Sequence, residues 1–319
     1  MKNISIDSAR NPVHSKNNLT KRILGRWQLY VFLIIPVIYI ILFNYVPMLG
    51  IQLAFKKFNA RLGIWGSPWV GFDQFIKFFT SYQFVRVIKN TLTLSFYGLL
   101  AGFPLPIILA LVLNSIRSER YKKFIQTVTY LPYFISLVVM VGILTQMLNP
   151  RIGMIANIYS FISGNEAPDM MSNPSAFPHI YVLSGVWQSI GYNSIIYIAA
   201  LSGVDPELHE AAEVDGASRF KRVIHVDLPT ILPTAAIMLI LNAGQIMNIG
   251  FDKAYLMQNP LNLSASEVIS TYVYKVGIAS STNDFSYATA IDFFNSSINM
   301  VLITVVNFIS KKLGGNSLF

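Results

Sequence analysis

Residues 205–229 read DPELHEAAEVDGASRFKRVIHVDLP, and this charged segment lies between two hydrophobic runs that are long enough to cross a membrane. Asp205 can cap the free backbone N–H groups at the start of a helix. Gly216 can adopt a positive φ at low steric cost, and Ser218 can cap a second short helix that ends at Leu228-Pro229. The segment therefore predicts a helix-turn-helix hairpin, called the hairpin below.

Charge and small residues are ordered along the hairpin. A solvated loop would also be charged, and an isolated run of charges is usually no more than that. Here a small pair, a glycine break and a closing Leu-Pro follow one another, which a random polar loop does not need. The first helix carries acidic residues at a spacing of three and the second is basic: Glu207, Glu210 and Glu213, then Arg219, Lys221, Arg222 and His225.

The composition is that of a membrane protein. Of 319 residues, 53% are hydrophobic and only 12% are charged, which is too apolar for an ordinary soluble domain. The chain contains no Cys, so it cannot form a disulfide or a thiolate metal site. A net charge of +9 could indicate nucleic-acid binding, but the basic residues are spread over loops between apolar runs. Membrane topology accounts for them better, so we expect the lipid bilayer and not nucleic acid as a partner.

Six apolar runs predict six transmembrane helices in an all-α protein. A helix needs about 20 residues to cross about 30 Å of hydrocarbon. Pro104, Pro106 and Pro132 lie inside these runs and predict kinks. The runs are 27–48, 88–113, 124–148, 180–201, 231–250 and 287–309.

The distribution of Lys and Arg predicts the orientation. Fifteen lie in the tail 1–26, the segment 117–123, the hairpin and the tail 311–319, and nine lie in the other connections or at their boundary. Basic residues concentrate on the cytoplasmic side of a membrane. Both tails are therefore expected to be cytoplasmic, flanking a transmembrane domain over residues 27–310.

Polar residues inside the apolar runs are the candidates for a solute path. Such residues are costly in lipid and are expected to point into the helix bundle. They could equally tie helix to helix through hydrogen bonds. Amides and carboxylates can bind the hydroxyls of a polar solute, and aromatic rings can pack on its apolar faces. The candidates are Trp187, Gln188, Tyr192 and Asn193, the set Asn242, Gln245 and Asn248, and the set Asp292, Asn295 and Asn299; each of the last two sets is predicted to share one helical face.

Two kinds of chemistry are missing from the sequence. No G-x-x-x-x-G-K-[ST] stretch occurs, so the chain has no Walker loop of its own for ATP. His209-Glu210 begins like a zinc-protease motif, but Glu213 stands where the second His would be. We therefore expect neither a catalytic centre nor a metal site, and any ATP-driven role needs a partner.

The hairpin resembles the cytoplasmic loop of inner-membrane permeases from binding-protein-dependent ABC importers. That loop reads E-A-A, two residues, D-G-A, and later L-P. Two positions depart, because Val223 stands for the usual Phe and Val226 for the usual Ile. The first apolar helix and the loop after it, residues 27–59, also resemble permeases of the carbohydrate branch. The matching hairpin residues are Glu210, Ala211, Ala212, Asp215, Gly216, Ala217, Leu228 and Pro229.

This resemblance implies a type I ABC importer permease fold in which residues 204–229 form the cytoplasmic loop that couples to the ATPase. It also implies a second, homologous permease, two ATP-binding cassette subunits that hold ATP and Mg²⁺, and an external solute-binding protein. The location would be the bacterial cytoplasmic membrane, and the cargo a sugar, in particular an oligosaccharide. Two alternatives remain open: a permease for another solute such as a peptide or amino acid, and a membrane anchor or assembly protein without a path.

Overall fold

The computed structural model describes residue 25 and residues 27–312, so most of the predicted N-terminal tail and residues 313–319 lie outside the described part. The chain divides into two compact units, Met1–Gln52 and Leu53–Phe319. The domain boundaries expected from the sequence, 27–310 between two tails, remain a prediction.

The first unit contains one apolar helical segment. It runs through α2 (Trp27–Ile40), the π-helix η1 (Ile41–Tyr45) and α3 (Val46–Met48), and continues as the 3-10 helix η2 (Leu49–Phe55). No side chain of α2, η1 or α3 is buried. A helix that is apolar on every side is typical of a membrane span, as predicted for the first run.

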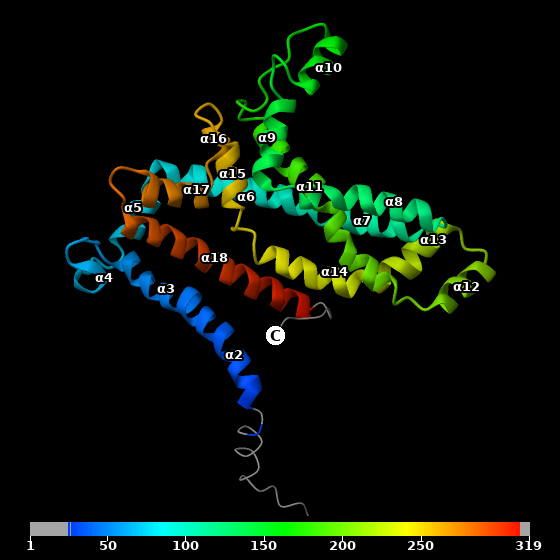
Figure 1. The fold of residues 1–319 in the computed structure, drawn as a ribbon, viewed down its shortest axis with the longest axis horizontal. Helices are drawn as coiled ribbons and strands as arrows, with labels where there is room; N and C mark the ends of the chain where they lie inside the picture. The colour runs from blue at the N-terminus through cyan, green and yellow to red at the C-terminus, as the bar shows by residue number, and fades with distance from the viewer. Residues whose placement is uncertain (1–24, 26, 313–319) are drawn as a thin grey trace, which may run out of the picture. The chain divides into compact units, whose positions relative to one another are not determined.

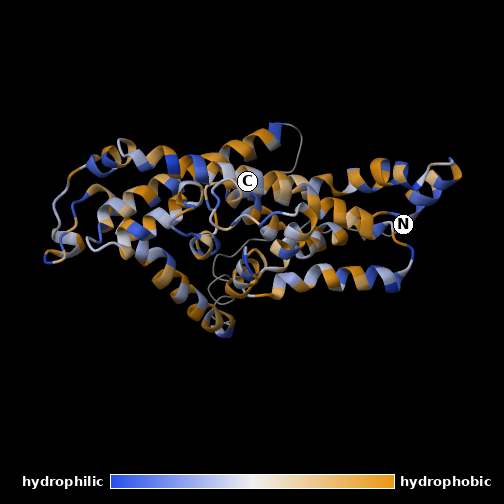
Figure 2. Cartoon of the chain, turned by 90° about the horizontal axis from the view of Figure 1, so that it is seen from above, coloured by the Kyte–Doolittle hydropathy of each residue, from blue (hydrophilic) through white to orange (hydrophobic). Residues whose placement is uncertain are grey.

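The second unit is built around α11 (Phe177–Leu201), which contacts α6, α7, α8 and α14. Figure 1 shows α12 and α13 at one end of this unit and α5 and α17 toward the other. Hydrophobic residues extend along the long helices (Figure 2). The other long helices are α6 (Tyr82–Gly102), α7 (Pro104–Asn114), α8 (Glu119–Tyr130), α9 (Leu137–Met147), α14 (Leu228–Ala243) and α18 (Phe285–Lys312).

Short elements connect the long helices. Within the described residues the only β structure is one isolated bridge between Lys56 and Trp69, so the all-α prediction is confirmed there. The short elements are α4 (Gly63–Gly66), α5 (Asp73–Phe79), η3 (Leu131–Phe134), α10 (Met154–Ser163), α12 (Pro206–Val214), α13 (Arg219–Arg222), η4 (Val223–Asp227), α15 (Phe251–Met257), α16 (Leu263–Ser266), α17 (Ile269–Tyr274) and η5 (Lys275–Ala279).

The predicted spans are recovered in part. Among the described residues, four helical segments are long and apolar enough to cross a membrane: Trp27–Phe55, Tyr82–Asn114, Arg219–Ala243 and Phe285–Ile309. The third run makes a fifth only if Glu119–Phe134 and Leu137–Met147 are one span, because the two parts bend by 99°. The fourth run lies in the 25-residue helix α11, which is not among these four segments. The number six therefore stays a prediction.

A close helix contact fixes α8 against α11. Gly191 is buried in α11, and a Cβ atom built there would lie 2.1 Å from the carbonyl oxygen of Thr129 in α8. Only a residue without a side chain allows two backbones to approach so closely. The smallest residue therefore sets the spacing of this helix pair.

Buried charged residues connect helices of the second unit through ion pairs and a hydrogen bond. Glu267 is 1% exposed, and its carboxylate pairs with Arg86 of α6 and with Lys275 of η5. Lys253 of α15 is also buried, and its Nζ donates a hydrogen bond of 2.6 Å to the carbonyl oxygen of Tyr181 in α11. Its ammonium lies 4.7 Å from the centre of the Tyr181 ring. These contacts tie the segment between α14 and α18 to α6 and α11.

Candidate functional site

The first arm of the hairpin forms as predicted. α12 begins after Asp205, whose Oδ1 accepts a hydrogen bond of 3.0 Å from the backbone N–H of Glu207. It ends at a turn in which Gly216 has φ +72° and Ala217 N–H donates 2.9 Å to the carbonyl oxygen of Ala212. A positive φ at this position needs Gly, or at some strain Asn. The cap and the turn are therefore both specified by local chemistry.

The second arm differs from the prediction. Ser218 caps α13 as expected, but the helix does not stop at Leu228-Pro229. α13 continues through the π-helix η4 into α14, so that Arg219–Ala243 forms one helical segment. Pro229 is the second residue of α14 and follows the π-helix η4 closely. The predicted end of the helix was wrong, and the hairpin is joined directly to a long membrane helix.

The outer side of the hairpin is exposed and partly apolar. Val214 is 88% exposed and Phe220 is 73% exposed, and Leu208 is also exposed. Glu210 and Ala211 are exposed between them. We call Leu208, Ala211, Val214 and Phe220 the hairpin patch. Large apolar side chains exposed at the end of a bundle indicate a surface for a protein partner.

The inner side of the hairpin is polar. His209 Nε2 of α12 lies 3.2 Å from Asp227 Oδ1, and Arg222 Nη1 lies 2.9 Å from Glu213 Oε2. Asn114 at the end of α7 donates 3.3 Å to the same Asp227 oxygen. These five residues line a cavity of about 390 Å³. The two sides of α12 thus differ. Leu208, Ala211 and Val214 of the hairpin patch are exposed, whereas His209 and Glu213 make the polar contacts.

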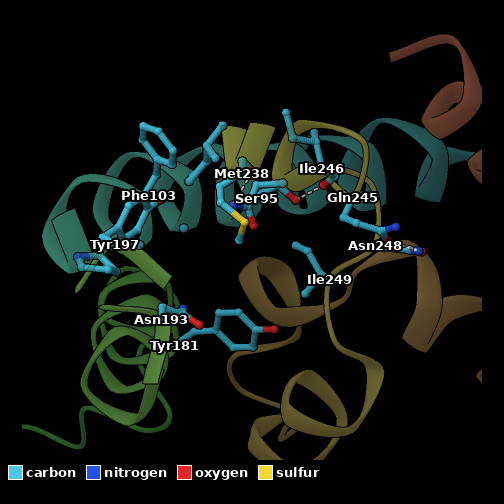
Figure 3. Close-up of a pocket in the computed structure, with 15 residues that line it drawn as sticks. Ser95, Phe103, Tyr181, Asn193, Tyr197, Met238, Gln245, Ile246, Asn248 and Ile249 are labelled. Atoms are coloured by element: carbon cyan, nitrogen blue, oxygen red, sulfur yellow. Dashed lines mark hydrogen bonds between the residues drawn. The ribbon is translucent and has the colours of Figure 1, made fainter. Parts of the chain in front are cut away.

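A second cavity, of about 360 Å³, is lined by residues of α6, α7, α11 and α14 (Figure 3). It brings together four of the predicted polar residues, Asn193, Asn242, Gln245 and Asn248. Asn248 Nδ2 donates 2.8 Å to Gln245 Oε1. We call this space the amide cavity. Its other lining residues come from α6, α7, α11, α14 and the segment after α14, and they include Ser95, Phe103, Pro106, Tyr181, Tyr197 and Met238.

One predicted helical face does not exist as such. α14 ends at Ala243, so Asn242 belongs to a helix whereas Gln245 and Asn248 belong to the irregular segment 244–250. Asn242, Gln245 and Asn248 do lie together at this cavity, but they do not share one helical face. An irregular backbone at this place needs partners for its polar groups. Ser95 Oγ donates to the carbonyl oxygen of Ile246, which supplies one of them.

The three predicted polar residues of α18 lie in three different environments. Asp292 lines a separate cavity of about 410 Å³ with Tyr274 and Thr289. Asn295 is buried, and its Oδ1 has no hydrogen-bond partner among the residues that the structure describes. Asn299 Oδ1 accepts 3.0 Å from the N–H of Met247. None of the three lines the amide cavity.

Three predicted residues of α11 face away from the amide cavity. Gln188 Nε2 donates 3.0 Å to the carbonyl oxygen of Ile135. The Tyr192 ring stacks on Tyr133, with centroids 3.8 Å apart and the planes inclined by 3°. Trp187 lines an apolar hollow with Leu144 and Leu148.

Sequence reasoning missed several lining residues. Tyr197 lies four residues after Asn193, a spacing that helical phase could have revealed. Ser95 and Pro106 reach the amide cavity from other helices, and no sequence pattern brings them to Asn193. The structure also contains no group of three or more acidic or His residues able to hold a metal ion, within the residues that it describes.

The four long apolar helical segments define a multi-pass membrane protein. More particularly, residues 102–315 match the family described as binding-protein-dependent transport system inner membrane component, and the chain belongs to this family. The match includes the whole hairpin and, of the helices around the amide cavity, α7, α11 and α14; α6, apart from its last residue, lies before it. The chain is thus an inner-membrane permease component and not an enzyme.

Relatives and solved structures agree over nearly the whole chain. Protein LplB of Bacillus subtilis (strain 168) is 40% identical over 294 residues, which are 92% of this chain and 91% of that protein. The polygalacturonan/rhamnogalacturonan transport system permease protein YteP of the same strain is 36% identical over 315 residues, 99% of this chain and 97% of that protein. A bacterial ABC transporter that imports the acidic polysaccharide alginate contains a chain with a TM-score of 0.85 and 39% identity, covering 92% of this chain and 99% of that one. The predicted permease fold is confirmed.

Proposed function

We propose that this chain is a permease subunit of an ATP-driven importer for an oligosaccharide, and that the amide cavity is part of its path. The amide cavity is the observation that carries this proposal. Its side-chain amides and tyrosines match the hydroxyls and apolar faces of sugar rings. YteP is a permease of a polygalacturonan/rhamnogalacturonan transport system, and the similar solved transporter imports the polysaccharide alginate, which agrees with such a cargo.

The hairpin is proposed to couple this path to ATP hydrolysis. The hairpin patch would lie in a groove of an ATP-binding subunit, a helix-in-groove contact. Glu210, Ala211, Ala212, Asp215, Gly216, Ala217, Leu228 and Pro229 give the hairpin its shape and its contact surface. Two such subunits would hold ATP and Mg²⁺, since this chain has no Walker loop.

The remaining partners follow from the same architecture. A second, homologous permease would complete a heterodimer around the path, and an external solute-binding protein would deliver the sugar. One solved relative is described in complex with an alginate pentasaccharide-bound periplasmic protein. Closure of the ATP-binding subunits would move the hairpin and switch the helices between outward-open and inward-open arrangements. Both termini would then lie in the cytoplasm, on the side of the hairpin.

Gln245 provides the test of the path. Gln245→Leu removes an amide from the cavity wall without adding charge, and with it the oxygen that accepts from Asn248 Nδ2. A neutral hydrogen bond contributes about 0.5–1.5 kcal/mol, so we expect uptake of a labelled oligosaccharide to fall about 2- to 10-fold. Uptake is measured in vesicles and normalised to assembled complex. Asp292→Leu is the matched comparison, because Asp292 lines a different cavity. If Gln245→Leu transports at the parent rate, the amide cavity is not the path; if only Asp292→Leu is impaired, the path runs along α18 instead.

Gly216 provides the test of coupling. Pro fixes φ near −65°, whereas Gly216 has φ +72°, and Pro would also remove the N–H that donates 3.0 Å to the carbonyl oxygen of Glu213. Gly216→Pro should abolish transport and association with the ATP-binding subunit while the protein still inserts. Gly216→Asn is the control, because Asn tolerates a left-handed backbone. Normal association of Gly216→Pro would refute the role of the hairpin.

A further inference from the structure

Asp227 is a buried carboxylate at the junction between the hairpin and a membrane helix. It lies at the end of η4 and is 3% exposed. One oxygen, Oδ1, is approached by His209 Nε2 of α12 at 3.2 Å and by Asn114 Nδ2 of α7 at 3.3 Å. One atom therefore joins α12 and η4 of the hairpin to α7, which is far from them in the sequence.

The π-helical form of η4 makes this junction possible. His209 and Glu213 are four residues apart, so they share one face of α12. Their partners Asp227 and Arg222 are five residues apart, which in a regular α-helix would separate them by about 140° around the axis. A π-helix closes its turn over five residues, so η4 (Val223–Asp227) brings both partners to the side that faces α12. π turns inside α-helices are frequent at functional sites.

The two contacts differ in strength. Glu213 is exposed, so water screens its ion pair with Arg222 and the pair contributes little. The carboxylate of Asp227 is shielded from water, and a charge-assisted hydrogen bond to such a group is among the stronger ones. The contact of His209 with Asp227 therefore holds α12, and the pair of Glu213 with Arg222 only assists.

The helices joined at Asp227 also line the amide cavity. α14 continues from η4 and carries Met238 and Asn242, and α7 carries Pro106. From Asp227 to Asn242 is 15 residues, or about 22 Å along a helix at 1.5 Å per residue. A displacement of α12 would thus reach two walls of the cavity through one buried contact. Coupling between distant sites is carried by contiguous contacts and rigid elements of this kind.

We propose that His209, Asp227 and Asn114 form the contact that transmits movement of the hairpin to α14 and α7, with His209 and Asp227 as positioning residues for transport. This inference rests on the proposed coupling role of the hairpin. It adds which atoms carry the movement from the docking surface to the path. It also explains why the second arm does not stop at Leu228-Pro229, since a break there would separate the contact from the cavity.

The test compares variants of the contact in the assembled importer. His209→Ala removes the donor, and His209→Gln keeps one, because the Gln Nε2 amide can donate to Asp227. We expect His209→Ala to lower the sugar transported per ATP hydrolysed about 10-fold with basal ATP hydrolysis retained. His209→Gln should recover to within about twofold of the parent, and Glu213→Ala, the exposed control, should also stay within about twofold.

A double variant guards against loss of folding. His209→Ala leaves the Asp227 charge with one partner fewer, which could prevent assembly. In His209→Ala/Asp227→Leu no buried charge is left unpaired, and replacing both partners by apolar groups is nearly neutral for stability. This complex should assemble, bind its ATP-binding subunits and hydrolyse ATP, yet transport about 10-fold less sugar per ATP. An assembled double variant that transports as much sugar per ATP as the parent would overturn the inference.

The outcomes also separate this inference from the coupling role itself. If Gly216→Pro blocks association while the His209 and Asp227 variants transport normally, the hairpin couples but Asp227 is not the contact, and the inference fails alone. If Gly216→Pro has no effect either, the hairpin is not the docking element, and the proposed coupling fails first. A double variant that loses transport per ATP while binding its ATP-binding subunits supports the inference directly.

Discussion

Gly191→Ala should separate α8 from α11, because the new Cβ atom would lie 2.1 Å from the carbonyl oxygen and 2.4 Å from the carbonyl carbon of Thr129. The obstacle is backbone, so no side-chain rotation relieves it. An ordinary contact begins near 3.4 Å, and the two helices would have to move apart by about 1.3 Å. Overpacking of this kind costs about 1–3 kcal/mol and occasionally more; with two backbone atoms in conflict we expect about 3 kcal/mol.

The assay is thermal unfolding of the assembled complex in detergent. A loss of about 3 kcal/mol should lower the apparent midpoint by roughly 5 °C or more. Gly142→Ala is the matched control, since Gly142 also lies inside a helix, α9, and a Cβ atom there meets nothing within 4 Å. Ala favours a helix over Gly by up to about 1 kcal/mol, so the control should be unchanged or more stable. Equal midpoints for Gly191→Ala and the control would refute the close approach of the two helices.

Three further predictions concern charge and topology. Burial lowers the pKa of Lys253 from 10.5 to about 8. Between these pH values the unfolded chain binds more protons than the folded one, so stability should rise with pH from about 8 to about 10.5. In thermal melts the Lys253→Met variant should not show this rise, and a parent midpoint that does not change with pH contradicts the burial. Glu267→Ala removes the buried carboxylate that pairs with Arg86 and Lys275, whose side chains are 33% and 58% exposed, and should cost about 1.5–3 kcal/mol in the same assay. Lys77→Ala breaks an exposed pair and should cost at most about 1 kcal/mol; similar losses would show that burial does not separate them. A reporter fused after Phe319 should be cytoplasmic and one inserted near Asn165 external, and either on the opposite side refutes the six-helix topology.

The hairpin could be predicted from the sequence because its chemistry is local. Asp205, Gly216 and Ser218 each act on backbone groups within three residues of themselves, so one stretch of sequence contains both the cause and the effect. The end at Leu228-Pro229 was predicted from the same kind of rule and was wrong. A Pro does not always end a helix, since α14 itself continues past Pro233, and at Pro229 the π-helix η4 precedes it. No local sequence pattern predicts the change from α-helix to π-helix at η4.

The amide cavity could be predicted only in part, since it is a tertiary feature. Asn193 and Asn242 belong to helices that the sequence placed in the membrane, and the structure brings them to one space. Helical phase could not show that Asp292 and Trp187 line other spaces. Phase tells which residues of one helix share a side, whereas the choice of neighbour depends on how the helices pack.

The segment 244–250 shows why polar residues gather where a membrane helix is interrupted. The backbone of Ile246 and Met247 does not satisfy itself as a helix would, so Ser95 of α6 donates to the carbonyl oxygen of Ile246 and Asn299 of α18 accepts from the N–H of Met247. Irregular backbone at membrane depth is tolerated where it is buried in protein or lines a cavity, and interrupted helices at that depth are typical of substrate sites in transporters. Asn299 therefore fits the interpretation of a tie between elements, whereas a place for Gln245 and Asn248 in a solute path stays a prediction. Asn299 ties one helix to the segment, and that tie keeps Gln245 and Asn248 in the cavity wall.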